Sequence, residues 1–368
     1  NGLEKRPKLR FPGFDEPWSI YKAEELFKNV ADKNHPMETV LTIIQGKGTL
    51  PREQAGRNIH YDDASLANYK KVEQGDFIIH LRSFEGGLEM ANEDGIVSPA
   101  YTILRCKKPH SSLFYEAYFH TDEFINHILS KSVEGIRDGR QISYEAFKWL
   151  GLPYCDVSEQ ERIAQLFCTL SHRIEKQQQM VDALKKYKRG LIKLVFEKVM
   201  SEAHYQLPLS DLCISISSGR TTVNESNGRY PLFGSTGIVG MTNTIEHDGD
   251  IVMVARVGAN AGKVNFFSGR CGVTDNTLVI RVKENTIHPK FLAYFLENFD
   301  LHKLIFGSGQ PLVTGGQLKK IQSPVIAYKA QLLITRSLES LDRIIGTQDT
   351  YMEKLIQLKS GLMQRLFI

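Results

Sequence analysis

The chain has 368 residues, a formal net charge of +4 and a composition that is 42% hydrophobic and 24% charged. These values are typical of a globular protein with room for two domains. They exclude a membrane-spanning chain, because no apolar run approaches the ~20 residues that cross a bilayer. The first residues lack the apolar stretch of a signal peptide, so we expect a cytoplasmic protein. The small positive charge is compatible with nucleic-acid binding but does not require it.

The first 155 residues predict a mixed α/β domain. Residues 75–79 are typical of a strand that follows a glycine turn, and residues 103–105 predict a second strand. Tyr118 and Phe119 lie in an apolar segment that we expect to be helical.

Residues 156–203 predict a long helix. Ser158 and Glu161 are spaced as a capping box, which marks a helix start. The following positions advance in alternating steps of four and three residues, which keep side chains on one seam of a helix, as in a coiled coil. This ladder is mostly apolar and consists of Ile163, Phe167, Leu170, Ile174, Gln177, Val181, Leu184, Lys188, Leu191 and Val195.

Residues 204–325 and 326–368 resemble the first domain and the first helix. Residues 249–253 and 279–281 match the two earlier strands, and Tyr294 with Phe295 matches the earlier aromatic pair. Adding 171 to each ladder position gives Ile334, Leu338, Leu341, Ile345, Gln348, Met352, Leu355, Lys359, Leu362 and Leu366.

The second ladder also keeps the interruptions of the first. Every apolar position stays apolar, the glutamine and the lysine both return, and Gly190 returns as Gly361. Matched interruptions are much harder to obtain by chance than matched apolar positions. We therefore interpret the two halves as a true internal repeat.

These elements predict an α/β (α+β) fold with two similar domains, at 1–155 and 204–325, separated by two long helices at 156–203 and 326–368. If the two seams pack together, the second helix runs back along the first, giving an antiparallel coiled coil with pseudo-two-fold symmetry. The polar seam positions either fix the register or, for the lysines, reach out to solvent. Leu166, Ile192 and Leu194 lie outside the ladder and are expected to be exposed for a partner.

The motifs of common enzyme classes are missing from the sequence. There is no phosphate-binding GxxxxGK[ST] loop, no GxGxxG turn between a strand and a helix, and no HExxH or GxSxG motif. The histidines, acidic residues and five cysteines lack metal-ligand spacing, and we expect the thiols to be reduced. We therefore expect no catalytic residue, no metal and no bound cofactor in this chain.

Several loops of both domains are rich in groups that contact DNA. Arginine pairs with guanine, asparagine and glutamine pair with adenine, and lysine and threonine bind phosphates. The candidate DNA-binding residues are Lys47, Arg52, Arg57, Arg82, Arg137, Arg140, Arg220, Thr221, Arg256, Asn260 and Gln310. The alternative is that these loops are ordinary turns. The basic run at 185–189 is either a solvated helix face or a phosphate contact.

Three further segments carry a resemblance to a known family. They are the start at 7–14 with Trp18, the entry into the first helix from Pro153 to residues 160–164, and the similar helix endings at 188–191 and 359–367. The chain resembles the specificity (S, HsdS) subunit of type I restriction-modification systems. One departure is the second helix start, where Ala327, Tyr328 and Lys329 replace the capping box.

The resemblance implies two target-recognition domains, each reading one half of a split, asymmetric site in double-stranded DNA. The helices would set the spacer and dock two modification (methyltransferase) subunits, which methylate adenine, and restriction subunits, which cleave. S-adenosylmethionine, ATP and Mg are then expected in those partner subunits. The alternatives are a coiled-coil scaffold without sequence-specific DNA binding and an enzyme with an unfamiliar site.

Overall fold

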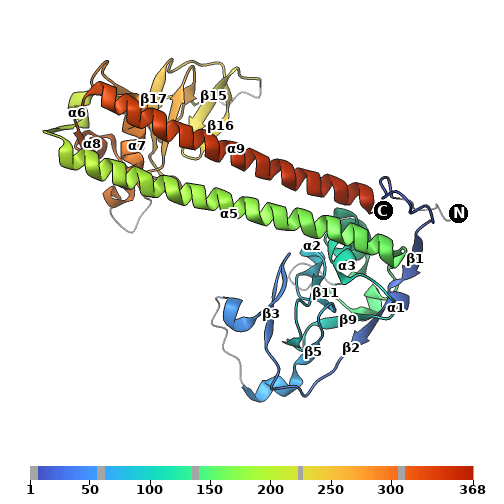
Figure 1. Cartoon of the computed structure of the whole chain (residues 1–368). Coiled ribbons are helices and arrows are strands. Elements are labelled where there is room, and N and C mark those ends of the chain that lie inside the picture. The colour runs from blue at the N-terminus through green and yellow to red at the C-terminus, as the bar shows by residue number, and fades with distance from the viewer. Residues whose placement is uncertain (1–6, 56–62, 135–140, 223–226, 306–310, 368) are drawn as a thin grey trace. The chain divides into compact units, whose positions relative to one another are not determined.

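The computed structural model describes residues 7–55, 63–134, 141–222, 227–305 and 311–367 (Figure 1). The chain divides into two compact units. Unit 1 comprises residues 1–178 and 351–368, and unit 2 comprises residues 179–350. Each unit therefore contains one domain together with a part of both long helices, whereas the sequence treated the helices as separate segments.

Unit 1 is built on a four-stranded antiparallel sheet. Its order is β2 (Phe27–Val30), β9 (Thr102–Cys106), β6 (Phe77–Ile79), β7 (Glu89–Met90). Helix α3 (Ser112–Phe119) packs its aromatic side chains against the strands, with the rings of Phe77 and Phe119 4.9 Å apart and those of Phe27 and Tyr115 5.2 Å apart. These fully buried rings form the core of the unit.

The other elements of unit 1 are short. Its paired strands are β1 (Ser19–Lys22) with β12 (Gly151–Tyr154), β3 (Leu41–Ile44) with β4 (Gly48–Pro51), β5 (Lys70–Val72) with β8 (Gly95–Val97), and β10 (Val133–Glu134) with β11 (Gln141–Ile142). Its short helices are α1 (Ala23–Leu26), α2 (Ser83–Gly86), α4 (Tyr144–Phe147), the 3-10 helices Arg52–Ala55, Asp63–Asn68 and Leu129–Ser132, and the π-helix Glu123–Ile128.

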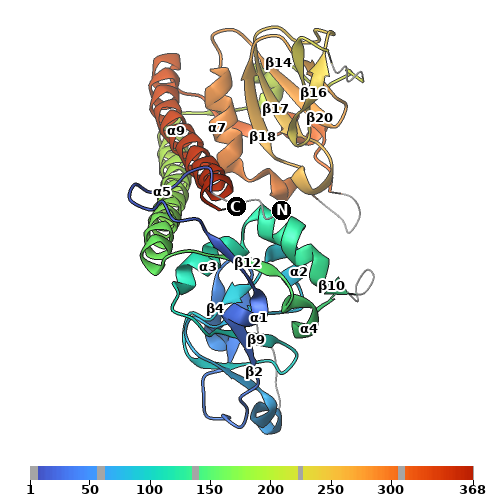
Figure 2. The same ribbon diagram turned by 90° about the vertical axis from the view of Figure 1, so that its right-hand side faces the viewer.

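Unit 2 contains the same kind of sheet. Its order is β14 (Cys213–Ser218), β20 (Thr277–Val282), β17 (Asp250–Ala255), β18 (Val264–Ser268). Helix α7 (Pro289–Phe299) lies against β17 and β18 (Figure 2). A second sheet has the order β16 (Gly237–Thr242), β15 (Tyr230–Gly234), β19 (Gly272–Val273). The remaining elements are β13 (Gln206–Pro208), which pairs with β21 (Gln322–Pro324), α6 (Leu209–Leu212), α8 (Gly315–Lys319) and the 3-10 helices Gly258–Asn260 and Leu301–Leu304.

The internal repeat is confirmed by the corresponding order of the two four-stranded sheets. The predicted strands at 75–79 and 249–253 become β6 and β17, which occupy the same position in their sheets. The predicted strands at 103–105 and 279–281 become β9 and β20 in the same way. The aromatic pairs lie in α3 and α7.

Two buried glutamines show the repeat in detail. The Gln160 side chain accepts a hydrogen bond from the Ser111 amide (3.0 Å) and donates one to the Cys155 carbonyl (2.9 Å). The Gln331 side chain accepts a hydrogen bond from the His288 amide (2.7 Å) and donates one to the Ile326 carbonyl (3.0 Å). Ser111 and His288 are the N-cap residues of α3 and α7. Each glutamine therefore joins a long helix to the helix that covers its sheet.

The first long helix, α5 (Val157–Glu202), does not begin as the sequence predicted. Asp156 is the residue at its start, where a carboxylate oxygen accepts a hydrogen bond from the Ser158 amide (2.8 Å). The predicted capping box at Ser158 and Glu161 is therefore wrong. An aspartate two residues earlier satisfies the free amide, and Ser158 lies inside the first turn.

Within each unit, α5 and α9 (Tyr328–Leu366) pack side by side in opposite directions. In unit 1, Phe167 stacks on Phe367 with ring centres 5.6 Å apart, and Arg173 donates a hydrogen bond to the Tyr351 hydroxyl (3.1 Å). Residue numbers therefore rise along α5 as they fall along α9. Unit 2 repeats this pattern, since the Lys185 ammonium lies 3.0 Å from the Asp349 carboxylate and that of Lys188 lies 2.8 Å from Asp342.

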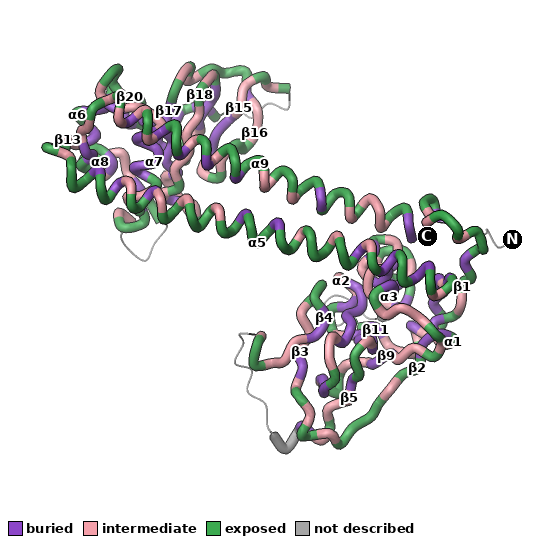
Figure 3. Tube along the Cα trace, viewed as in Figure 1, coloured by how far each residue is buried: buried purple, intermediate pink, exposed green. Residues whose placement is uncertain are grey.

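All the predicted apolar seam positions are buried or half-buried (Figure 3). They are Ile163, Phe167, Leu170, Ile174, Val181, Leu184, Leu191, Val195, Ile334, Leu338, Leu341, Ile345, Met352, Leu355, Leu362 and Leu366.

The residues expected to be exposed outside the seam divide into two groups. Leu194 is 66% exposed, as expected. Ile192 is buried in the core of unit 2, and Leu166 packs against the core of unit 1. For these two residues the prediction is wrong, because the ladder identifies the face between the helices but not the second face that packs on each domain.

Candidate nucleic-acid interface

The turn between β3 and β4 presents Lys47 to solvent. Gly46 and Gly48 on either side have φ values of 74° and 75°, a left-handed conformation that favours glycine. At Gly48 a side-chain carbon would also lie 2.5 Å from the Met90 carbonyl oxygen. The sequence Gly46-Lys47-Gly48 therefore encodes a tight turn with a cation at its tip.

A buried carboxylate on β7 holds this turn. Glu89 accepts a hydrogen bond from the Gly46 amide (2.7 Å) and another from the Gly48 amide (2.9 Å), and its carboxylate lies 3.3 Å from His120 Nε2. Burial pushes the pKa of Glu89 upward, but the hydrogen bonds from His120 and the glycine amides outweigh it and lower that pKa. The Asn92 side chain adds hydrogen bonds to the Lys47 and Thr49 carbonyls.

Two further candidates from unit 1 lie on neighbouring segments. Arg82 follows β6, is exposed and forms an ion pair with Glu85 of α2, with 2.8 Å between Nε and Oε2. Gln45, beside the turn, lies directly against Gly86 of the same helix. Arg52 begins the 3-10 helix after β4, is half-buried, and its guanidinium lies 6.0 Å from the centre of the Tyr69 ring.

In unit 2, Arg220 is exposed on the loop that follows β14. The Glu246 carboxylate accepts hydrogen bonds from the Arg220 amide (2.9 Å), the Thr221 amide (3.1 Å) and the Thr221 hydroxyl (2.7 Å). Burial pushes the pKa of Glu246 upward, but these hydrogen bonds outweigh it and lower that pKa. Thr221 is only 5% exposed, so its hydroxyl organises the loop rather than facing solvent. This position does not support the prediction that Thr221 touches DNA.

Arg256 and Asn260 lie near the same end of the unit 2 sheet as Arg220. Arg256 is half-buried directly after β17, and its amide donates a hydrogen bond to the Asn276 carbonyl (2.9 Å) just before β20. The neighbouring Gly219 amide donates to Thr277, the first residue of β20 (3.0 Å). The structure therefore brings the loops that carry Arg220 and Arg256 to the two sides of one strand. Asn260 is half-buried at the end of the next 3-10 helix.

The remaining candidates lie outside the described residues. They are Arg57, Arg137, Arg140 and Gln310.

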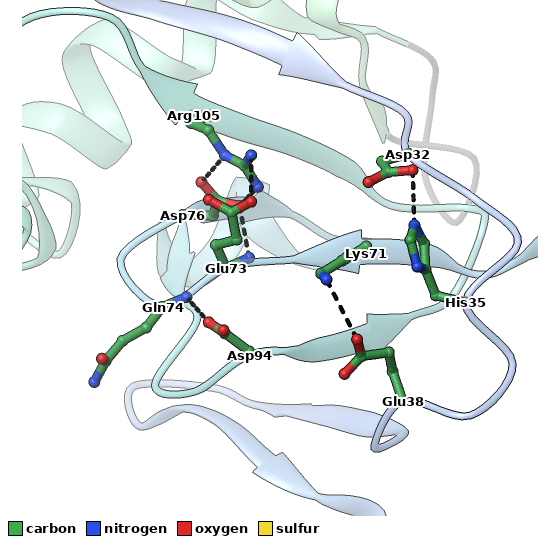
Figure 4. A network of polar contacts seen from close by, with 9 residues as sticks. All are labelled: Asp32, His35, Glu38, Lys71, Glu73, Gln74, Asp76, Asp94 and Arg105. Carbon is green, nitrogen blue, oxygen red and sulfur yellow. Dashed lines mark hydrogen bonds and ion pairs between the residues drawn. The ribbon is translucent and has the colours of Figure 1, made fainter.

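A separate polar network in unit 1 consists mainly of charges that neutralise one another (Figure 4). Arg105 of β9 points toward Asp76 and Glu73, with 2.7 Å between the nearest nitrogen and oxygen atoms of each pair. The Lys71 ammonium lies 3.3 Å from the Glu38 carboxylate. Because carboxylates surround these cations, the network stabilises the domain and is a poor surface for DNA phosphates.

The basic run on α5 is partly neutralised as well. Lys185 pairs with Asp349, while Lys188 pairs with Asp342 and lies 3.3 Å from the Glu297 carboxylate of α7. In unit 1 the matching Lys359 donates a hydrogen bond to the Ser171 hydroxyl (2.8 Å). The two seam lysines therefore have partners inside their units instead of simply extending into solvent.

The described part of the chain contains no group of three or more histidine, cysteine, aspartate or glutamate side chains placed to hold a metal. All five cysteines are free thiols. No described helix combines the length and apolar character that crossing a bilayer requires.

A family model described as a type I restriction modification DNA specificity domain matches residues 206–355. The chain is 28% identical to the type I restriction enzyme EcoprrI specificity subunit of Escherichia coli, over 33% of this chain and 30% of that protein. It is also 28% identical to the MjaVIII specificity subunit of Methanocaldococcus jannaschii, over 39% of this chain and 36% of that protein. The matched segments span about a third of the length of these relatives.

Solved structures share the fold over nearly the whole chain. The S subunit of a type I restriction-modification system from M. genitalium matches with a TM-score of 0.66 at 14% identity, covering 99% of both chains. A structure that describes the assembly and conformational transition of a type I R-M system matches with a TM-score of 0.56 at 15% identity, covering 96% of this chain and 98% of that one. The family model and the curated relatives show that this chain is similar to specificity (S, HsdS) subunits of type I restriction-modification systems, and the solved structures show that it shares their fold.

Proposed function

We propose that this chain is the DNA sequence-recognition subunit of a cytoplasmic type I restriction-modification complex. Its target is a bipartite, asymmetric site in double-stranded DNA, and each domain reads one half of that site. The observation that carries this proposal is the occurrence, in both units, of the same sheet with an exposed cation on a fixed loop: Lys47 in one and Arg220 in the other.

The two readers are expected to recognise different bases. The four-stranded sheets correspond, but the loops around them have different lengths, sequences and supporting strands. Lysine and arginine supply affinity where they contact phosphates and specificity where they reach guanine edges, as other polar side chains do at the remaining bases. A shared frame with unlike loops is therefore suited to two unlike half-sites.

The long helices set the spacer and dock the partners in this proposal. They retain exposed apolar side chains in both units: Leu194 and Leu333 in unit 2 are 66% and 57% exposed, and Leu358 in unit 1 is 50% exposed. Exposed apolar side chains of this size are consistent with partner contacts. We propose two modification subunits and additional restriction subunits as these partners. Methylation with S-adenosylmethionine and cleavage with ATP and Mg belong to them, and this chain is non-catalytic.

Selection from a library of random DNA duplexes tests the proposal. The purified complex with its own modification subunits should enrich two specified half-sites separated by a gap of fixed length, and binding should weaken steeply as salt rises. Deleting the same number of turns from both helices should shorten the gap and leave both half-sites unchanged. Binding that is insensitive to salt and enriches no sequence would contradict the proposal and favour the coiled-coil scaffold.

A further inference from the structure

In each unit, one glutamate carboxylate accepts hydrogen bonds from the loop that carries an exposed cation, Lys47 in unit 1 and Arg220 in unit 2. In unit 1, Glu89 is fully buried and accepts hydrogen bonds from the amides on both sides of Lys47. In unit 2, Glu246 accepts hydrogen bonds from the amide of Arg220 itself and from Thr221. In both cases the carboxylate binds the backbone, so the cationic side chain remains available to solvent.

The two carboxylates are not copies of one another in the repeat. Glu89 lies on β7 of the four-stranded sheet, whereas Glu246 lies between β16 and β17 and also contacts the Val273 amide of the second sheet (3.4 Å). The loops that they hold come from different places as well, one from the β3–β4 turn and one after β14. A carboxylate that binds the backbone of a cation-bearing loop therefore occurs in each half at positions that do not correspond in the repeat.

Glu89 is buried and Glu246 is half-buried. Such carboxylates require nearby donors, because loss of hydration is costly unless hydrogen bonds replace it. Both carboxylates find their donors mainly in loop backbone. These hydrogen bonds hold the loop backbone in one arrangement. The backbone positions of Lys47 and Arg220, from which their side chains extend, are therefore fixed. Reading a base edge needs this precision, since a hydrogen bond weakens steeply when its geometry is poor.

We propose that Glu89 and Glu246 are positioning residues for sequence reading, each of which fixes the loop that presents Lys47 or Arg220 to one half of the DNA site. This inference rests on the proposed function. Neither carboxylate contacts DNA in the proposal, and each acts on its own half alone.

The test uses Glu89→Gln and Glu246→Gln in the complex with the modification subunits of the same system. A glutamine keeps the size of the side chain but replaces one accepting oxygen with a donor that faces a loop amide. Glu53→Gln and Glu284→Gln make the same change at exposed glutamates of the same units and serve as matched controls. Gly46→Ala is a second variant, because it strains the turn at a φ of 74° without any contact between the new carbon and other atoms.

Selection from random duplexes measures the discrimination in each half-site, and hydrogen exchange measures protection of the loop amides. Glu89→Gln and Gly46→Ala should reduce discrimination by about tenfold in one half only, and Glu246→Gln should do so in the other half. The salt dependence of binding should change little, whereas protection of the loop amides should fall in the half that carries the variant. The exposed controls should match the parent protein.

Three outcomes would contradict one or both proposals. If the parent protein selects no sequence, the proposed function fails and this inference fails with it. If the parent selects two half-sites but the variants keep full discrimination in both, only the inference is overturned. Loss in both halves from a single variant also overturns it, since that result indicates a general effect on the fold.

Discussion

Units 1 and 2 share a frame but differ in what is added to it. Both have the same sheet order, a helix packed on the sheet, and a buried glutamine that ties that helix to a long one. The additions differ: unit 1 has the separate strand pairs β3–β4 and β5–β8, whereas unit 2 has the three-stranded sheet β16-β15-β19. The shared part attaches each domain to the helices. The Lys47 turn belongs to the part that differs, whereas the Arg220 loop leaves the shared sheet after β14 and is held by Glu246 from outside that sheet. Under the proposed function, this division would allow the sequence preference to change while the contacts with the helices are kept.

The units also differ at the helix ends. In unit 1 a segment that includes Arg10 and Trp18 covers the start of α5, and both side chains donate hydrogen bonds to the buried Glu159. In unit 2 the position that corresponds to Glu159 is Ala330, which lines an apolar groove of about 760 Å³ with Ile334 and other residues. The start of the long helix is therefore covered by an N-terminal segment in unit 1, whereas in unit 2 it borders an apolar groove.

The largest expected effect comes from exchanging one of the two domains that are proposed to read DNA. Replacing residues 204–325 with the corresponding domain of a relative should change one half of the recognised motif completely and leave the other half intact. The reason is that the frame and the helix contacts are common to both domains. Sequencing of methylated adenines measures the result, and a change in both halves would contradict the division into frame and loops.

The shared glutamines should be essential to the frame in both units. Gln160→Ala or Gln331→Ala leaves an amide and a carbonyl unpaired and opens a small cavity, so each should lower the free energy of unfolding by about 3 kcal/mol. Urea unfolding measures this value. Gln165→Ala and Gln357→Ala change exposed glutamines of the same helices and should have almost no effect. A similar decrease in the free energy of unfolding of the controls would show that the hydrogen bonds of Gln160 and Gln331 are not responsible for the effect.

The covering segment should contribute stability in unit 1 only. Glu159→Ala removes the ion pair with Arg10 and leaves the Trp18 indole N–H without its acceptor. Because Arg10 is partly exposed, we expect a smaller loss of about 2 kcal/mol in the free energy of unfolding. Glu161→Ala, at an exposed position, is the control. An unchanged unfolding midpoint for Glu159→Ala would show that the segment does not stabilise the helix start.

The smallest expected effect is a pH dependence confined to unit 1. Burial pushes the pKa of His120 downward, but its contact with Glu89 outweighs this and raises that pKa above the ordinary 6.5, while the pKa of Glu89 is lowered below 4.5. The pair is therefore fully charged between these two limits. Its stabilisation is lost as the pH rises through the raised pKa of His120 or falls through the lowered pKa of Glu89.

Protection of the Gly46 and Gly48 amides against hydrogen exchange should follow this window. We expect the protection to decrease as the pH rises through the raised pKa of His120, because the neutral imidazole no longer stabilises the Glu89 carboxylate that holds these amides. Glu116, His80 and Arg82 also act on this cluster, and burial raises the pKa of Glu116 and lowers that of His80. In unit 2, burial lowers the pKa of His247, so the Arg220 loop should lack this step. Equal steps in both loops, or a step that persists in His120→Phe, would refute the assignment.

The sequence predicted the frame better than the site. The two ladders, offset by 171 residues, identified both helices and the repeat, because helical periodicity is a local property that apolar side chains report directly. Gln160 and Gln331 share that offset, so they could have been recognised from the sequence. Glu89 and Glu246 could not, because each binds loop amides that only the folded chain brings near. The true helix cap, Asp156, was missed because Ser158 offered an equally good local pattern.

The most direct test of the central claim is the set of methylated adenines in cells that carry this chain with the modification subunits of its own system. Two readers on one repeated frame should produce a single motif with two unlike specified halves and a gap of constant length. A continuous motif, two identical halves, or methylation without any sequence preference would contradict the account.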